Sequence, residues 1–229
     1  MAKKLYTATE LGLTPVYVNE VKDIPSGITK VCVGGGIDRT EEFASEVGHQ
    51  QNNTVTEAYI APRATKIGSY AFANYSGLNS VEISNSVEEI GRSAFGYCSS
   101  LTTIEIPKGV TVIDDLAFVS CSNLTSITIP DGVTIIGFSA FEKCTSLASI
   151  TLPSSVNTIN SSAFKNCSSL TTITIPSNVT SIGNFVFTFC SSLTEINYLG
   201  SQEQWDAITK GSKWDENSGA YTIKYNVAP

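Results

Sequence analysis

The sequence predicts a β-rich repeat solenoid, in which one structural unit recurs along the chain and stacks on its neighbours. Three columns of identical residues, each with a spacing of 23, support this prediction. They are the phenylalanines Phe72, Phe95, Phe118, Phe141, Phe164 and Phe187, the cysteines Cys98, Cys121, Cys144, Cys167 and Cys190, and the prolines Pro107, Pro130, Pro153 and Pro176. A period this strict is typical of solenoids, whose core grows by the addition of coils.

The opening segment of each repeat predicts a half-buried strand. In the repeat that begins at Leu101, Ile104 and Ile106 alternate with Thr103 and Glu105. Alternation of β-branched apolar residues with polar ones places one set of side chains inward and the other outward.

A turn follows the strand and returns the chain to the core. Pro107 ends the strand because it has no N–H to donate to a neighbouring strand, and Lys108-Gly109 suits a turn. Val110 and Ile113 then supply two more inward apolar side chains.

The last part of the repeat has the pattern A-F-x-x-C, as in Ala117, Phe118 and Cys121. The pattern fits one short helical turn or a tight arc. Stacked coils should lie roughly 4.8 Å apart, the spacing of strands in a sheet. The phenylalanines should then form a continuous aromatic column.

Charge and hydropathy exclude two classes of partner. The net charge is −7, and no cluster of basic residues is longer than Lys3-Lys4, so a nucleic-acid partner is not expected. No run of 18 apolar residues occurs, which argues against membrane insertion. Residues 1–30 show no apolar signal-peptide segment, which leaves a cytoplasmic location open.

The full repeat, S-L-T-S-I-T-I-P-x-x-V-T-x-I-G-x-x-A-F-x-x-C, resembles the BspA-like bacterial surface-antigen subclass of leucine-rich repeats. The resemblance covers Val55 to Tyr198, with Tyr75 and Val186 departing from the pattern in the terminal repeats. It implies a right-handed leucine-rich-repeat solenoid with a parallel concave sheet, short helical turns on the other side and terminal caps. It also implies a cell-surface or secreted bacterial protein.

The segments that flank the repeats divide the chain into three parts. Residues 1–54 are interpreted as an N-terminal cap or a small separate module with strands at Val16–Val18 and Ile28–Val33. Residues 55–198 form the solenoid. Residues 199–229 resemble the end cap of the family, with a short helix over 201–208 that faces the last coil through Trp205 and Ile208, and a closing strand over 221–225.

The cysteine column admits three interpretations: buried free thiols, disulfides or a metal site. Its five members are an odd number at one repeated core position, and no C-x-x-C pair suggests zinc. Free thiols that pack as small hydrophobic groups are favoured. Cys32 lies outside the column and is not assigned.

Other candidate sites are weak, and we expect no catalytic residue, cofactor or metal. His49, the single histidine, lies in a polar stretch without an evident catalytic partner. Gly34-Gly35-Gly36 lacks the further residues of a phosphate-binding loop. Asp114-Asp115 is interpreted as part of a solvated surface.

The outward strand positions form the candidate binding strip, which the resemblance places on the concave face. Its residues are Glu57, Tyr59, Ser80, Glu82, Thr103, Glu105, Ser126, Thr128, Ser149, Thr151, Thr172, Thr174, Glu195 and Asn197. One interpretation is a hydroxyl ladder kept for β-propensity and solubility. The other is a binding strip with an acidic end and a hydroxyl centre.

Three functional hypotheses follow. The resemblance favours a non-enzymatic module for protein interaction or adhesion, with a host or microbial surface protein as its partner. The alternative is a structural spacer or assembly component without its own ligand. The paired hydroxyls of the central repeats also suggest a surface that binds a glycan, whereas Ser in place of Thr at two positions argues against ice binding.

Overall fold

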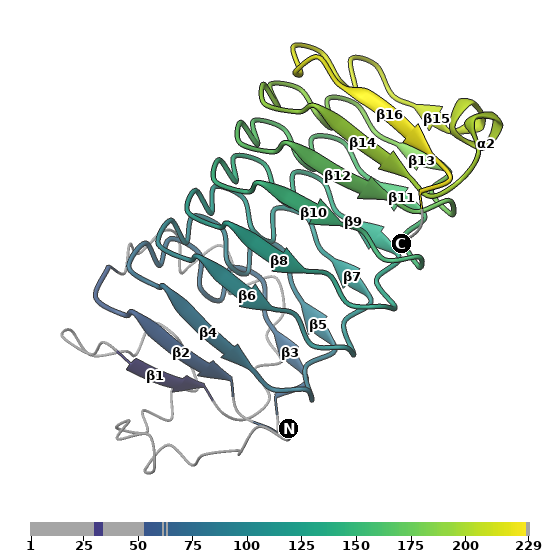
Figure 1. The fold of residues 1–229 in the computed structure, drawn as a ribbon. Helices are drawn as coiled ribbons and strands as arrows, with labels where there is room; N and C mark the ends of the chain where they lie inside the picture. The colour runs from purple at the N-terminus through teal and green to yellow at the C-terminus, as the bar shows by residue number, and fades with distance from the viewer. Residues whose placement is uncertain (1–29, 34–52, 61, 63, 228–229) are drawn as a thin grey trace.

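The protein is an elongated stack of coils in a computed structural model that describes residues 30–33, 53–60, 62 and 64–227 (Figure 1). The wide side of the stack, here called the front face, carries one parallel strand per coil. Its strands are β1 (Lys30–Val33), β2 (Glu57–Ile60), β4 (Ser80–Ile83), β6 (Thr103–Glu105), β8 (Ser126–Thr128), β10 (Ser149–Thr151), β12 (Thr172–Ile175), β14 (Glu195–Tyr198) and β16 (Thr222–Tyr225).

The opposite side, the back face, carries a second parallel sheet of two-residue strands. These are β3 (Lys66–Ile67), β5 (Glu89–Ile90), β7 (Val112–Ile113), β9 (Ile135–Ile136), β11 (Thr158–Ile159), β13 (Ser181–Ile182) and β15 (Thr209–Lys210). They are the inward V-x-x-I segments of the sequence pattern. The solenoid thus has about seven turns and two parallel sheets, with one described helix, α2 (Gln202–Ala207).

The register of the front strands is one repeat. Thr103 pairs with Ser126, Ile104 with Ile127 and Glu105 with Thr128, all in parallel. Each inward side chain therefore lies against its counterpart in the next coil. This register is what converts a sequence column into a spatial column.

The A-F-x-x-C segment is a tight arc, so the short helical turns implied by the resemblance are not present there. Leu116 and Ser120 have φ values of 59° and 57° on either side of Phe118. The Phe118 N–H donates to Ala140 O of the next coil at 2.9 Å. A helical turn would use this N–H within its own segment. The bond between coils makes the arc part of the stack instead.

The core contains the predicted aromatic column. Rings of successive coils stack with centroids 5.4–5.8 Å apart and interplanar angles of 1–12°. Tyr75 meets Phe72 edge to face at one end, and Trp214 meets Phe187 in the same way at the other. All six phenylalanines are almost completely buried. The ends of the column are thus closed by larger aromatic residues.

The five cysteines of the column are buried free thiols, as the sequence favoured. Each thiol donates a hydrogen bond to the carbonyl of the Phe one coil earlier, at 3.0–3.2 Å. The column is therefore a ladder of thiol-to-backbone bonds between coils. These bonds satisfy buried carbonyl groups, which would otherwise be costly.

Close approach of adjacent coils explains the glycines after the back strands. A Cβ on Gly137 would lie 2.6 Å from Asp114 C and from Asp115 N, which is closer than a side chain tolerates. Asp114 and Asn160 occupy the equivalent position in their own coils. The requirement for glycine therefore alternates with local coil geometry.

At the N-terminal end, β1 adds to the front face by parallel pairing with β2, with Val31 opposite Ala58. The predicted strand over 28–33 therefore has its described part in the sheet. The predicted strand at 16–18, the glycine run at 34–36 and His49 lie outside the described residues. The division at residues 54 and 55 stays a prediction.

At the C-terminal end, the predicted helix is present. Ser201 caps α2 in a capping box with Gln204, and Trp205 and Ile208 are buried. The closing strand is also present as β16, which pairs with β14.

The predicted C-terminal cap also continues the coil geometry, which the sequence pattern did not show. β15 pairs with β13, and the Phe187 N–H donates to Trp214 O at 2.6 Å. Trp214 therefore occupies the place of the next Phe. The pattern was missed because α2 lengthens the spacing from Ile196 to its partner Ile223 to 27 residues.

Candidate interaction surfaces

The front face presents the predicted strip as two rows of side chains in register. The first row runs through Glu57, Ser80, Thr103, Ser126, Ser149, Thr172 and Glu195, and the second through Tyr59, Glu82, Glu105, Thr128, Thr151, Thr174 and Asn197. In β4, β6, β8 and β10 all of these side chains are exposed. The strip is therefore most accessible over the first half of the solenoid and its centre.

The two ends of the strip are less accessible than its centre. Tyr59 is 8% exposed, so its expected role as an accessible binding residue is not met in this structure. Its strand is flanked on both sides by paired strands, β1 and β4. At the other end, Thr172, Thr174 and Asn197 are half-buried.

Glu195 also belongs to the half-buried end and is engaged within the protein. Its carboxylate forms an ion pair with Lys224 of β16. Hydrogen bonds from Lys224 and then Asn197 lower the pKa of the Glu195 carboxyl. Glu195 is therefore committed to the closing strand.

Glu82 and Glu105 give the exposed strip its negative end. They occupy equivalent positions of β4 and β6, which lie side by side, and both are exposed. Like charges at neighbouring positions of a sheet are destabilising. Stability of the sheet therefore does not explain this pair.

The thiol column has no accessible chemistry. Burial raises the pKa of Cys121 and of Cys190 to about 12, and it raises the pKa of Cys98, Cys144 and Cys167 as well. The thiols therefore stay protonated at neutral pH, whereas nucleophilic and metal-binding cysteines act as thiolates.

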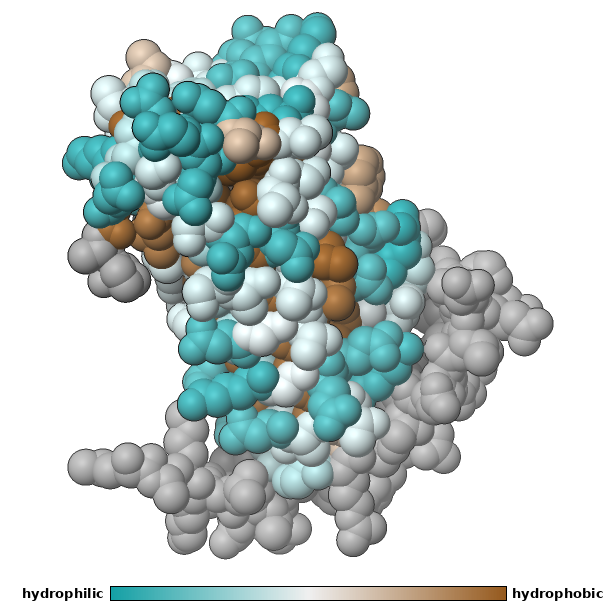
Figure 2. Space-filling model, turned by 90° about the vertical axis from the view of Figure 1, so that its right-hand side faces the viewer, coloured by the Kyte–Doolittle hydropathy of each residue, from teal (hydrophilic) through white to brown (hydrophobic). Residues whose placement is uncertain are grey.

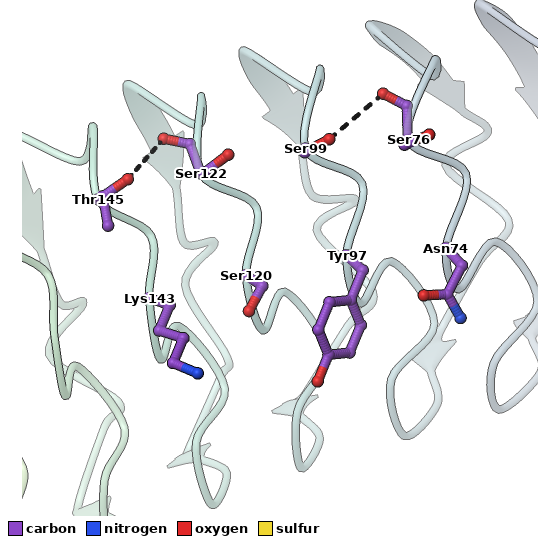
Figure 3. A pocket seen from close by; sticks show the side chains of 8 residues that line it. All are labelled: Asn74, Ser76, Tyr97, Ser99, Ser120, Ser122, Lys143 and Thr145. Carbon is purple, nitrogen blue, oxygen red and sulfur yellow. Dashed lines mark hydrogen bonds between the residues drawn. The ribbon is translucent and has the colours of Figure 1, made fainter. Parts of the chain in front are cut away.

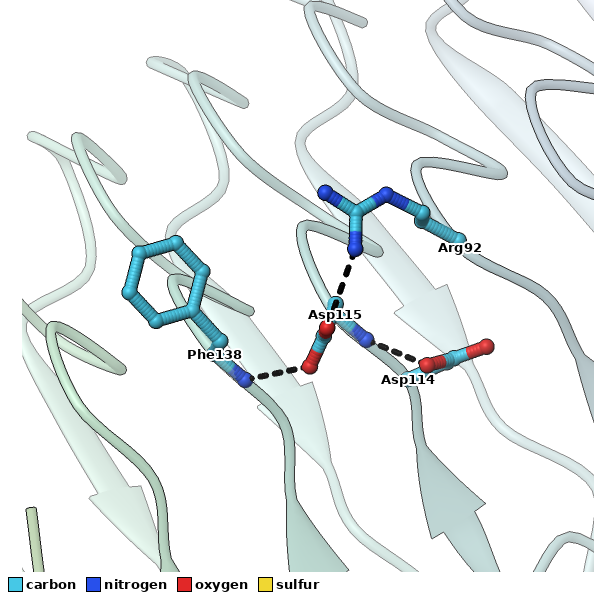
Figure 4. A network of polar contacts seen from close by, with 4 residues as sticks. All are labelled: Arg92, Asp114, Asp115 and Phe138. Atoms are coloured by element: carbon cyan, nitrogen blue, oxygen red, sulfur yellow. Dashed lines mark hydrogen bonds and ion pairs between the residues drawn. The ribbon is translucent and has the colours of Figure 1, made fainter. Parts of the chain in front are cut away.

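The acidic pair Asp114-Asp115 is structural, in contrast to the solvated surface that the sequence suggested (Figure 4). Asp115 accepts from Arg92 Nη1 at 3.0 Å and from the Phe138 N–H at 2.8 Å, while its own N–H donates to Asp114 at 2.6 Å. A hydrogen bond with Tyr70 is the main cause of the raised pKa of Arg92. The cluster ties three coils together.

Metal binding and membrane insertion find no support in the residues that the structure describes. No group of three His, Cys, Asp or Glu side chains there could hold a metal ion. Within the same residues, no helix is long and apolar enough to cross a membrane.

A groove on the arc side of the solenoid was missed by sequence reasoning. It has a volume of about 480 Å³ and crosses four coils (Figure 3). Its lining residues are Asn74, Ser76, Tyr97, Ser99, Ser120, Ser122, Lys143 and Thr145. They lie two and four residues after each Phe, in columns whose residue types vary, so the repeat pattern alone did not mark them.

Comparison with known proteins agrees with this architecture. Six copies of the BspA type leucine rich repeat region match residues 49–134 and 111–209. No curated protein sequence matches the chain.

Several solved leucine-rich repeat structures are similar. One from T. pallidum has 22% identity and a TM-score of 0.63, over 84% of this chain and 86% of its own. One from Bacteroides ovatus has 25% identity and a TM-score of 0.53, over 76% of this chain and 56% of its own. One from Eubacterium ventriosum has 17% identity and a TM-score of 0.58, over 84% and 59%.

These likenesses establish the fold rather than a ligand. The repeat match covers more than half of the sequence, with the Phe, Cys and Pro columns in their expected register. The chain belongs to the BspA type leucine-rich repeat family.

Proposed function

We propose that this protein is a non-enzymatic binding module whose front face contacts a protein ligand. The observation that carries the proposal is the strip of exposed polar side chains, held in register over β4, β6, β8 and β10. A parallel solenoid sheet repeats its outward groups about every 4.8 Å, which gives an extended surface for a macromolecule.

The charge of the strip indicates the kind of protein surface that it suits. Glu82 and Glu105 make its early half acidic, whereas Ser126, Thr128 and Ser149 supply hydroxyls at its centre. Complementary charge steers association and gives specificity. The proposed ligand is therefore a protein surface with lysines or arginines that face the acidic end.

Few aromatic residues contribute to this strip, and Tyr59 is buried. Because aromatic anchors supply much of the energy of tight interfaces, a single contact should be weak. Useful affinity would come from several modules or several ligand copies acting together.

The remaining surface fits a soluble, polar scaffold. Figure 2 shows a side of the molecule on which hydrophobic side chains lie in patches between hydrophilic and near-neutral ones. Membership of the BspA type family supports a place on, or release from, the bacterial cell surface, and adhesion as the purpose of binding.

The test is binding of the purified chain to an array of extracellular-matrix proteins, mucins and bacterial surface extracts. We expect saturable binding that the double variant Glu82→Lys/Glu105→Lys abolishes. The matched control is Glu88→Lys/Asp131→Lys, which makes the same change of charge at two exposed positions away from the strip.

Two results would contradict the proposal. Equal loss in both double variants would show that only net charge matters. Absence of saturable binding to every array member would favour the alternative, a structural spacer without its own ligand.

A further inference from the structure

The groove on the arc side is separate from the front face and is built from two rows of side chains. One row consists of Asn74, Tyr97, Ser120 and Lys143, and the other of Ser76, Ser99, Ser122 and Thr145. Figure 3 shows that each of four successive coils contributes one residue to each row. The groove therefore runs across the coils and presents polar groups at the spacing of the repeat.

The two rows differ in how their polar groups are used. Thr145 Oγ1 donates to Ser122 O at 3.2 Å, and Ser99 Oγ donates to Ser76 O at 3.5 Å, so this row ties coils together. Among the described residues, no side-chain hydrogen bond or ion pair holds the Asn74 amide, the Tyr97 hydroxyl or the Lys143 ammonium. The first row therefore has donors and acceptors available for a ligand.

Lys143 differs from most basic residues of the described chain. Ion pairs hold Lys66, Arg92, Lys165, Lys213 and Lys224. Lys143 is exposed, and the groove has no acidic lining residue, although the protein has 21 acidic and 14 basic residues. The groove is thus a local cationic site on an acidic protein.

Backbone preference does not explain Tyr97 and Lys143. The residues of the first row have φ values of 57–65°, the left-handed region that Asn adopts readily and Tyr or Lys rarely does. Asn74 and Asn166 satisfy that preference, whereas Tyr97 and Lys143 do not. Their side chains therefore have to be explained by something other than the turn.

The chemistry of the groove points to one ligand class. The ring of Tyr97, a residue 53% exposed, offers a flat apolar face, while hydroxyl and amide groups lie beside it and a cation lies further along. A sugar ring has an apolar C–H face and an edge of hydroxyls, and a uronic or sialic acid adds a carboxylate. We propose that this groove binds a short oligosaccharide that carries a carboxylate.

Each part of such a ligand has a counterpart in the groove. The sugar face stacks on Tyr97, its hydroxyls exchange hydrogen bonds with Asn74 and Ser120, and its carboxylate pairs with Lys143. The groove is shallow and polar, without an apolar pocket of the kind that anchors a peptide side chain. Recognition of sugar hydroxyls and charge is therefore favoured over recognition of a peptide.

The experiment is isothermal titration calorimetry of the full chain with tetragalacturonic acid, a hyaluronan hexasaccharide and sialyllactose. We expect at least one to bind, with affinity that falls as salt rises. For a uronic acid ligand, methyl esterification of the carboxylates should weaken binding by on the order of tenfold, as should Lys143→Gln. Tyr97→Asn should have a similar effect, and Asn suits the backbone conformation of that position.

Matched controls separate a site effect from a general one. Lys108→Gln removes a different exposed lysine, and Phe189→Ala changes an exposed aromatic residue at the same column position, outside the groove. Both should bind as the wild type does. Glu82→Lys/Glu105→Lys should also retain the oligosaccharide, which distinguishes this site from the front face.

Three outcomes would overturn the proposal. None of the three oligosaccharides binds, or the Lys143 and Lys108 variants lose affinity equally, or tetraglutamate binds as well and with the same dependence on Lys143. The last result would make the groove a general anion site rather than a sugar site.

Discussion

The interior and exterior positions of each coil share a period of 23 residues but differ in which side chains they keep. Inside, the same Phe and Cys recur from coil to coil, with rings stacked at 5.4–5.8 Å. Outside, the second front row changes from Glu105 through Thr128 to Asn197. The inner residues meet copies of themselves above and below, whereas the outer ones meet solvent.

This difference separates two kinds of information in the sequence. A column that repeats reports the stacking of coils, because identical neighbours select identical side chains. A column that varies reports something local to one coil. Both proposed binding surfaces lie in varying columns, and the predictions below test this separation in order of decreasing effect on stability.

The largest expected effect is that of truncating the aromatic column. Phe141→Ala should lower the free energy of unfolding by about 3–5 kcal/mol, because it opens a cavity between two stacked rings. Chemical denaturation measures this loss. Phe189→Ala, at an exposed position, is the control and should change stability by about 0.5 kcal/mol or less. Similar losses for both would mean that the column is not the core of the stack.

The next effect concerns the close approach of coils. Gly137→Ala should cost about 1–3 kcal/mol because its Cβ would meet the backbone of Asp114 and Asp115. Gly68→Ala is the control, since a Cβ there meets nothing within 4 Å in the described part of the chain. Thermal melting of both variants compares them. Equal melting temperatures would show that the coils can move apart at little cost.

The thiol column predicts a loss of stability at alkaline pH. Burial raises the pKa of Cys121 from 9.0 to about 12 in the folded protein, so the unfolded chain loses its proton first. This contribution to stability is complete below about pH 9 and is lost as the pH rises toward 12. Between pH 8 and pH 10, Cys121→Ala should lose about 1 kcal/mol less than the wild type. Parallel pH dependence of the two proteins would contradict the assigned burial.

Much of the fold could be predicted because its signals are local and repeated. Alternation around Ile104 and Ile106 predicted the front strands, and the Phe and Cys columns predicted the core. The arc was not settled between two forms, because its conformation depends on bonds such as that from Phe118 N–H to the next coil. The continuing coil at Trp214 was hidden by the insertion of α2.

The candidate sites were predictable only in part. Strand alternation placed the front rows outward, but the burial of Tyr59 depends on tertiary surroundings rather than on alternation. The groove was not foreseen, since Tyr97 and Lys143 have different residue types and come together only when the coils stack. A search for unusual residues at left-handed turn positions could have singled them out.

The most direct test of the separation between core and surface uses one variant, Glu82→Lys/Glu105→Lys, in two measurements. The exchange keeps two like charges side by side, so the free energy of unfolding should stay within about 0.5 kcal/mol of the wild type, while protein binding at the front face is lost. A loss of stability comparable to that of Phe141→Ala, or binding that persists, would contradict the assignment of function to the exterior strip.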